Sequence, residues 1–109
     1  MELGTQSKPR YRMIVKVHKT PDGRKVIAVC DSDLIGKRFE EGKLQLDLSS
    51  SFYDGKEMSE KEIIELLKNS CVVNIVGKKI INLAIKLGIV NKKNIIKIKN
   101  IPHAQAVLE

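Results

Sequence analysis

A β-hairpin is predicted by residues 11–30, which read YRMIVKVHKTPDGRKVIAVC. Residues 11–18 alternate apolar and polar side chains, as a half-buried strand does. Residues 20–23 (TPDG) are turn sequence, because proline fixes the first corner and glycine accepts a positive φ. Residues 24–30 are apolar on both faces after Lys25, which predicts a central strand that is covered on both sides.

The next part of the chain predicts a short helix, a strand and a loop. Residues 31–33 (DSD) offer N-cap oxygens to a helix that runs through Phe39 and ends at Gly42. Residues 43–48 (KLQLDL) alternate again, so we expect the leucines of this strand to point inward: Leu44, Leu46 and Leu48. Residues 49–56 (SSSFYDGK) are predicted to form a loop.

A second helix is indicated by a capping box. Ser59 and Glu62 stand at the spacing at which each caps the other's backbone, and this helix is predicted to run to about Asn69. Its buried residues are predicted to be Ile63, Ile64 and Leu67. Residues 71–76 (CVVNIV) are rich in β-branched side chains and predict a buried strand.

The last third predicts a third helix and one or two strands. After Gly77, the helix is expected to reach Gly88, with an apolar stripe of Ile80, Ile81, Ala84 and Leu87 opposite Lys79, Asn82 and Lys86. Residues 94–101 predict a strand with Ile96 and Ile98 on one face and Lys97 and Lys99 on the other. Pro102 places this strand at a sheet edge or ends it, and residues 104–108 add a short final strand.

These elements predict an α+β fold. The 109 residues suit a single domain, residues 11–109, with a small mixed β-sheet of four to six strands and three helices packed on it. Residues 1–10 are predicted to be a flexible lead-in. The apolar runs are far shorter than a membrane span, and the first residues lack the apolar core of a secretory signal. The two cysteines, Cys30 and Cys71, do not have the spacing of metal ligands. We therefore expect a cytoplasmic protein with reduced thiols.

The net charge of +7 lies entirely in the last third. Residues 1–65 carry 12 basic and 12 acidic side chains, whereas residues 66–109 carry eight lysines and one acid, Glu109. A solvated surface would also explain lysines, but a field of one sign attracts polyanions. The candidate phosphate-binding residues are Lys78, Lys79, Lys86, Lys92, Lys93, Lys97 and Lys99.

Two motifs have both a ligand-binding and a structural interpretation. Asp31 and Asp33 stand at the spacing of an Asp-x-Asp pair that holds magnesium beside phosphates, but helix capping explains them without a metal. Gly77 and Lys78 open a helix after a strand, where an anion is favoured. The residues lack the rest of a nucleotide-binding loop, so an ordinary strand-to-helix turn is favoured. The sequence predicts no metal and no cofactor.

Two further groups are candidates for a site. Cys30, Asp31 and His103 have the residue types of a nucleophile, an orienting group and a base, although Cys30 also continues an apolar strand. Phe52 and Tyr53 could stack on bases or could fill the core and its rim. No catalytic motif is present, so the sequence predicts a protein that is not an enzyme.

Four blocks of sequence carry a resemblance to a known family. They are residues 29–37 (VCDSDLIGK), 51–55 (SFYDG), 74–77 (NIVG) and 102–105 (PHAQ). In this order they resemble the archaeal domain-of-unknown-function family 424, over about residues 11–108. The resemblance implies a small archaeal cytosolic protein, at most a predicted RNA-binding protein, with no established reaction.

The leading hypothesis is a non-enzymatic accessory factor that binds ribosomal or transfer RNA through the lysines of the last third. A second hypothesis is a module that docks on an acidic protein or dimerises through an exposed strand edge. A third is a small enzyme that uses Cys30, Asp31 and His103. The leading hypothesis requires the lysines to converge on one surface of the folded chain.

Overall fold

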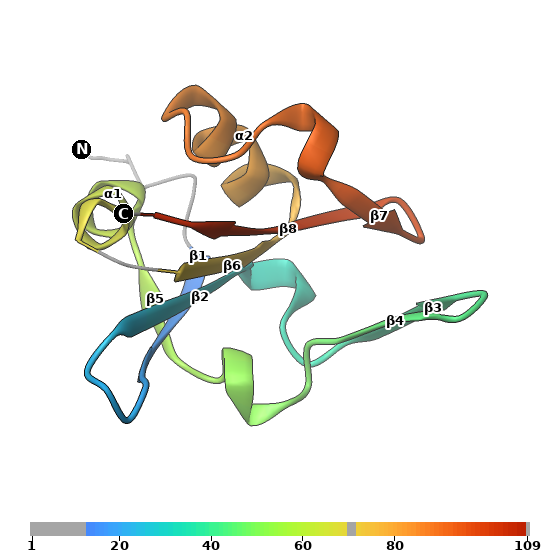
Figure 1. The fold of residues 1–109 in the computed structure, drawn as a ribbon. Coiled ribbons are helices and arrows are strands. Elements are labelled where there is room, and N and C mark those ends of the chain that lie inside the picture. The colour runs from blue at the N-terminus through green and yellow to red at the C-terminus, as the bar shows by residue number, and fades with distance from the viewer. Residues whose placement is uncertain (1–12, 70–71, 109) are drawn as a thin grey trace, which may run out of the picture.

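A six-stranded mixed sheet organises the chain (Figure 1). The computed structural model describes residues 13–69 and 72–108. The strand order is β5-β1-β2-β6-β8-β7. The strands are β1 (Met13–Lys19), β2 (Lys25–Asp31), β5 (Lys56–Met58), β6 (Val72–Val76), β7 (Ile96–Ile98) and β8 (Ile101–Val107). β2 and β6 are parallel, and every other neighbouring pair in this sheet is antiparallel.

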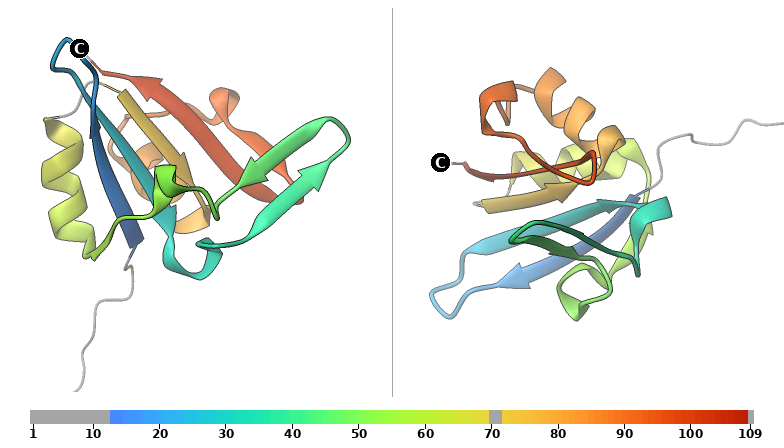
Figure 2. Two further views of the ribbon diagram at one scale, coloured as in Figure 1. Left: turned by 90° about the horizontal axis from the view of Figure 1, so that it is seen from below. Right: turned by 90° about the vertical axis from the view of Figure 1, so that its right-hand side faces the viewer.

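A second, two-stranded sheet projects from the six-stranded one (Figure 2). Its strands are β3 (Arg38–Glu41) and β4 (Leu44–Asp47). The helices are α1 (Glu60–Lys68) and α2 (Lys78–Lys86), and the single 3₁₀ turns are η2 (Ser32–Leu34), η3 (Ser51–Tyr53) and η4 (Lys92–Asn94). The predicted α+β fold with a mixed sheet is confirmed, with two α-helices in the described ranges where three were predicted.

Both helices pack on one face of the sheet. Buried Ile63 and Leu67 of α1 and buried Ile80 and Ala84 of α2 belong to one apolar cluster. The strand residues of this cluster all point to the same face of the sheet: Met13, Val15, Ile27, Val29, Val73, Ile75 and Ala104. Burial of these side chains removes apolar surface from water, which is the main stabilising term of the fold.

The opposite face of the sheet is covered by the β3–β4 hairpin and the turns around it. Its cluster joins Cys30 and Val76 on the sheet with Leu46 and Leu48 of the hairpin and Ile98 of β7. This smaller cluster does not extend over the whole face, and a pocket lined by residues of β6, β7 and β8 lies beside it.

Several local predictions are confirmed. Residues 20–23 form the turn of the β1–β2 hairpin, and Gly23 N donates to Thr20 O (2.9 Å). The capping box of α1 is present: Ser59 N donates to Glu62 Oε1 (2.9 Å) and Glu62 N donates to Ser59 Oγ (3.4 Å). Asn69 follows the last helical residue, as predicted.

The helix predicted from Asp31 to Gly42 is wrong. Residues 32–34 form only η2, and residues 38–41 form β3. The carboxylate that was expected to cap this helix bonds instead to the start of α2. Gly36 has a φ of 85°, which ends any helix, and its N–H donates to Leu48 O (2.8 Å) to begin the hairpin.

Five smaller predictions also need correction. Leu44 is 48% exposed because β3–β4 projects beyond the sheet, and β5 begins within the predicted loop at Lys56. Leu87 is exposed, whereas Leu83 completes the buried face of α2. The strand predicted over residues 94–101 is shortened to β7, because Lys99 and Asn100, both with positive φ, form the turn to β8. β7 does lie at the sheet edge, as predicted, but Pro102 is part of β8, which lies between β6 and β7 and begins at Ile101 rather than at residue 104.

The lead-in at residues 1–10, the start of the first predicted strand at Tyr11 and Cys71 lie outside the described residues. No helix in the described ranges is long and apolar enough to cross a membrane.

Candidate functional site

Helix α2 separates its apolar and basic side chains. Ile80, Ile81 and Ala84 are buried against the sheet, and the residues on the other side of the helix are exposed: Lys78, Lys79, Asn82 and Lys86. The parallel β2–β6 pair and the turn at Gly77 fix where the helix starts, and Gly77 N donates to Pro102 O (2.9 Å). The basic face of α2 is thereby held beside β7 and β8.

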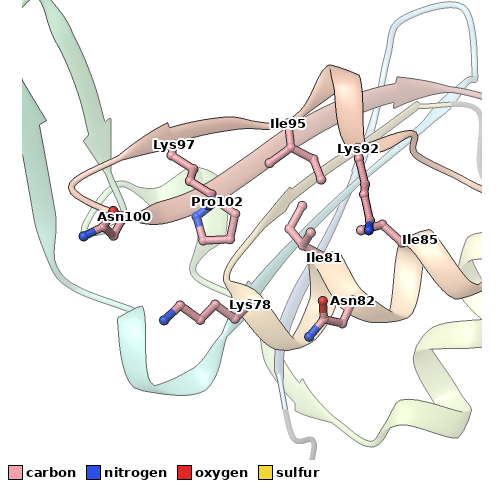
Figure 3. A pocket seen from close by; sticks show the side chains of 9 residues that line it. All are labelled: Lys78, Ile81, Asn82, Ile85, Lys92, Ile95, Lys97, Asn100 and Pro102. Atoms are coloured by element: carbon pink, nitrogen blue, oxygen red, sulfur yellow. The ribbon is translucent and has the colours of Figure 1, made fainter.

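A hollow of about 630 Å³ lies between α2 and the η4–β7 segment. We call it the lysine cleft, and it is lined by Lys78, Ile81, Asn82, Ile85, Lys92, Ile95, Lys97, Asn100 and Pro102. Figure 3 shows Lys92 pointing from η4 toward Ile85 on α2, while Lys97 lies beside Pro102. The cleft therefore joins an apolar floor to three ammonium groups from two segments of the chain.

A second hollow of about 340 Å³ adjoins the lysine cleft along α2 and shares Lys78 and Lys92 with it. Its further basic residues are Lys79 and Lys86, and its one acid is Glu60. In the described part of the chain, none of these lysines forms an ion pair. Five of the seven predicted lysines thus line two connected hollows.

The remaining two predicted lysines lie elsewhere. Lys93 is exposed on η4 and lines neither hollow. Lys99 lies in the β7–β8 turn, where its backbone N–H donates to Glu41 Oε1 (2.7 Å). The structure therefore brings a carboxylate next to Lys99.

The start of α2 is already bonded to a carboxylate. Asp31, at the end of β2, accepts hydrogen bonds from Lys79 N at Oδ2 (2.9 Å) and from Ile80 N at Oδ1 (3.0 Å). Burial raises the pKa of Asp31, and these two hydrogen bonds oppose that rise. An anion at this helix terminus would have to displace Asp31, so the turn at Gly77 is structural, as the sequence favoured.

Cys30 and His103 share a face of the sheet without meeting. Cys30 pairs with Val76 across β2–β6, and Val76 pairs with His103 across β6–β8. Two strand spacings separate them, or roughly 10 Å between Cα atoms. Cys30 Sγ donates to Asp31 O (3.3 Å) instead. Asp33 is exposed on η2, and no cluster of three metal-ligating side chains occurs in the described ranges.

The two neighbouring aromatic residues have different surroundings. Phe52 is stacked on His18 with ring centroids 4.4 Å apart and planes 11° apart, and His18 Nε2 donates to Phe52 O (2.9 Å). Tyr53 packs against the smaller apolar cluster and also lines a pocket on the open part of the sheet face. One face of Phe52 is therefore already covered, and Tyr53 remains the candidate for contact with a ligand.

A comparison with protein families matches residues 18–108 to DUF424, described as a protein of unknown function. The chain belongs to this family. The DUF424 chain also resembles a solved structure, the crystal structure of an uncharacterized conserved protein from Methanopyrus kandleri, with 26% sequence identity and a TM-score of 0.70. That likeness covers 90% of this chain and 95% of the other. No curated protein matches the chain.

The Cys30 thiol of this DUF424 chain is expected to react very slowly. Burial and the charges of Asp31 and Asp33 raise its pKa to about 12. Near neutral pH the thiolate fraction is then about three orders of magnitude below that of a free cysteine. In a Cys71→Ser variant, which leaves one thiol, iodoacetamide should modify the native protein at least about 100-fold more slowly than the same protein in denaturant. Equal rates in the two states would contradict a buried, protonated Cys30.

Proposed function

We propose that this protein is a non-enzymatic factor that binds structured RNA, such as ribosomal or transfer RNA, through its phosphates. The binding surface is the lysine cleft with its adjoining hollow along α2. One observation carries the proposal: five lysines from α2, η4 and β7 line two connected hollows in which Glu60 is the one acid. The proposal includes the cytoplasmic location that the sequence predicts.

The charge distribution supports the proposal independently of the cleft. Eight lysines and one acid follow Leu66, so the local field is not neutralised by nearby carboxylates in the sequence. Phosphate contacts of this kind release counterions and fix the orientation of the nucleic acid without reading its sequence. Duplex RNA is recognised mainly by shape and by its phosphates and 2′-hydroxyl groups, which suits a concave basic surface.

The test is charge reversal inside and outside the cleft. The cleft variant is Lys78→Glu, Lys92→Glu and Lys97→Glu, and the matched control reverses three exposed lysines elsewhere: Lys19, Lys37 and Lys43. Binding to a transfer RNA transcript and to a duplex RNA is measured by fluorescence anisotropy at several salt concentrations. We expect the cleft variant to lose about tenfold to 100-fold in affinity and its log–log salt slope to fall by about 2.

The control variant has the same net charge as the cleft variant, so it isolates position from total charge. It should lose only a few-fold in affinity and keep most of the salt slope. An equal loss in both variants would show that net charge alone attracts RNA. A native protein whose RNA affinity does not depend on salt would overturn the proposal.

The docking alternative depends on the free edges of the sheet. The edge strands β5 and β7 have three residues each, so each offers few backbone groups to a partner strand. Size-exclusion chromatography with the absorbance ratio of the purified protein separates the two hypotheses. RNA binding predicts a monomer that carries nucleic acid, whereas dimerisation predicts a larger species without it.

A further inference from the structure

A small neutral pocket lies on the face of the sheet opposite the lysine cleft. Its volume is about 260 Å³, and it is lined by Tyr53, Asn74, Asn94, Ile96, His103, Ala104 and Gln105. We call it the amide pocket, because three of these residues are carboxamides. None of its lining residues is charged at neutral pH, since burial also lowers the pKa of His103. A phosphate or a metal ion has no counter-charge here.

The polar groups of the amide pocket are not used within the fold. Asn74 of β6 lies directly opposite Gln105 of β8, so their carboxamides stand side by side on one face. No hydrogen bond in the described ranges involves the side chain of Asn74, Asn94 or Gln105. His103 Nδ1 is buried and has no partner there either. Asn94 and Gln105 are exposed, and Asn74 and His103 are half-buried, so their side chains are accessible to a ligand. The buried His103 Nδ1 atom lacks the partner that a buried polar atom normally has. Together these groups point to a ligand with several donors and acceptors.

The pocket also has apolar and aromatic walls. Ile96 is 50% exposed although it is a large aliphatic side chain on a strand. The ring of Tyr53 forms another wall, and burial raises its pKa to about 12, so it stays a neutral donor. A flat ligand with a polar edge fits such walls, and the volume is below that of a pocket for a drug-sized molecule. An unpaired nucleobase has this shape, and proteins read its edge with Asn and Gln carboxamides while aromatic rings stack on it.

The segment from η4 to β7 connects the amide pocket with the lysine cleft. Lys92 and Lys97 line the cleft, while Asn94 and Ile96 line the pocket. Adjacent residues of an edge strand point to opposite faces of the sheet, which explains how Ile96 and Lys97 serve different surfaces. The two hollows therefore lie on either side of one sheet edge, within reach of a single extended strand of RNA.

We propose that the amide pocket takes one unpaired nucleobase of an RNA whose phosphates lie in the lysine cleft. This inference rests on the proposed function, because the base is taken to belong to the RNA that the lysine cleft binds. It adds a base-contacting site to a surface that otherwise binds only phosphates.

The first experiment compares RNA hairpins that differ in one bulged nucleotide with a fully paired hairpin of equal charge. The native protein should bind at least one bulged hairpin about tenfold more tightly than the paired one. An Asn74→Val, Gln105→Val variant should lose this preference and keep both the affinity for the paired hairpin and its salt slope. Gln45→Val is the matched control, because Gln45 is an exposed strand amide outside the pocket, and it should keep the preference.

The second experiment separates the inference from the proposed function. The lysine-cleft variant should bind both hairpins more weakly and keep their ratio. Each of the four nucleosides is then added at millimolar concentration, without RNA, and the side-chain amide resonances of Asn74 and Gln105 are followed by NMR. At least one nucleoside should shift these resonances, both in the native protein and in the lysine-cleft variant. Equal binding of bulged and paired hairpins by a protein that still binds RNA overturns the inference alone. Loss of all RNA binding with intact nucleoside shifts overturns the proposed function and assigns the pocket to free nucleosides.

Discussion

Replacing Gly77 with alanine is expected to lower the free energy of unfolding by about 2–6 kcal/mol, a large part of the total for a domain of this size. The Cβ of an alanine at this position would lie 2.3 Å from the Asp31 Cγ atom and 2.4 Å from its Oδ2 atom. Gly77 also has a φ of 119°, a conformation that is strained for any other residue. The contact and the backbone strain therefore act together.

The Asp31 carboxylate cannot move away without a further loss. It accepts hydrogen bonds from Lys79 N and Ile80 N in the first turn of α2, so its displacement would leave these two N–H groups without that partner. Urea unfolding followed by circular dichroism measures the change. Gly88→Ala is the matched control: Gly88 has a φ of 76° but no atom within 4 Å of its Cβ position, so it isolates backbone strain. Equal losses at Gly77 and Gly88 would show that the contact with Asp31 contributes nothing.

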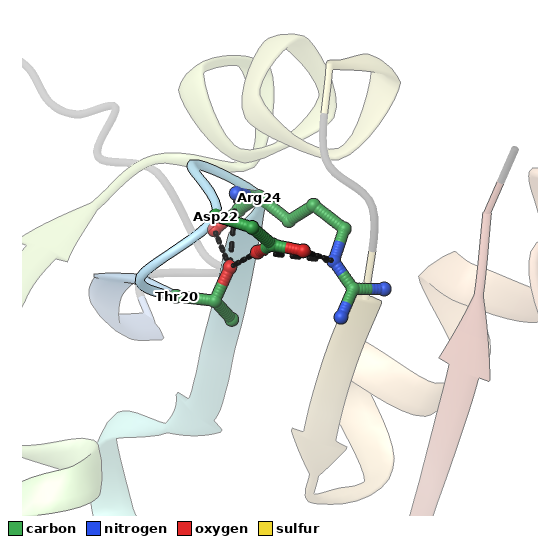
Figure 4. Close-up of polar contacts among 3 residues, drawn as sticks. All are labelled: Thr20, Asp22 and Arg24. Carbon is green, nitrogen blue, oxygen red and sulfur yellow. Dashed lines mark hydrogen bonds and ion pairs between the residues drawn. The ribbon is translucent and has the colours of Figure 1, made fainter.

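Elements whose signals are local were predictable from the sequence. The turn of the first hairpin is held by its own residues: Arg24 N donates to Thr20 Oγ1 (3.0 Å), and Arg24 Nε lies 3.3 Å from Asp22 Oδ2 (Figure 4). The capping box of α1 joins Ser59 and Glu62, three residues apart. In both cases the groups that stabilise the backbone stand beside it in the sequence, so their pattern can be recognised there.

The region after β2 was mispredicted because its partner is remote. The Asp-Ser-Asp sequence is typical of an N-cap, but the Asp31 carboxylate bonds to Lys79 N and Ile80 N, which lie in another part of the chain. Once that carboxylate is used, nothing caps a helix at residues 32–34, and Gly36 redirects the chain into the hairpin. Competition between local and tertiary hydrogen bonds decides such cases, and sequence pattern alone does not rank them.

The candidate site was partly predictable for a related reason. The excess of lysine in the last third can be counted in the sequence, so a basic surface could be predicted. Which five lysines line the two hollows depends on how α2 packs beside β7, and this follows only from the structure. The amide pocket was missed because its residues come from strands that are distant in sequence. The sequence does contain a weak signal, because Asn74 is a polar residue within the apolar run CVVNIV. Burying a carboxamide in such a strand costs free energy unless it forms hydrogen bonds.

Replacing Gly55 with alanine is the second substitution with a large expected effect, about 3 kcal/mol in the free energy of unfolding. Here the backbone conformation does not require glycine, because φ is not in the positive region. The Cβ would instead lie 1.9 Å from Val15 O and 2.9 Å from Lys16 Cα, both of which belong to the backbone of β1. The backbone of a paired strand cannot shift as easily as the end of a flexible side chain. The segment around Gly55 must therefore move away from β1 to make room for the Cβ.

That movement is expected to reach the amide pocket. Gly55 lies between Tyr53, which lines the pocket, and Lys56, which starts the pairing of β5 with β1. Its N–H donates to Tyr53 O (3.0 Å), so the two residues are displaced together. Hydrogen exchange should therefore become faster in β5, and urea unfolding should occur at lower concentration, while Asp54→Ala, an exposed neighbouring change, should alter neither. Unchanged exchange in β5 would contradict the close approach of Gly55 to the β1 backbone that the structure shows. It would also mean that Tyr53 is positioned only by its packing against the smaller apolar cluster.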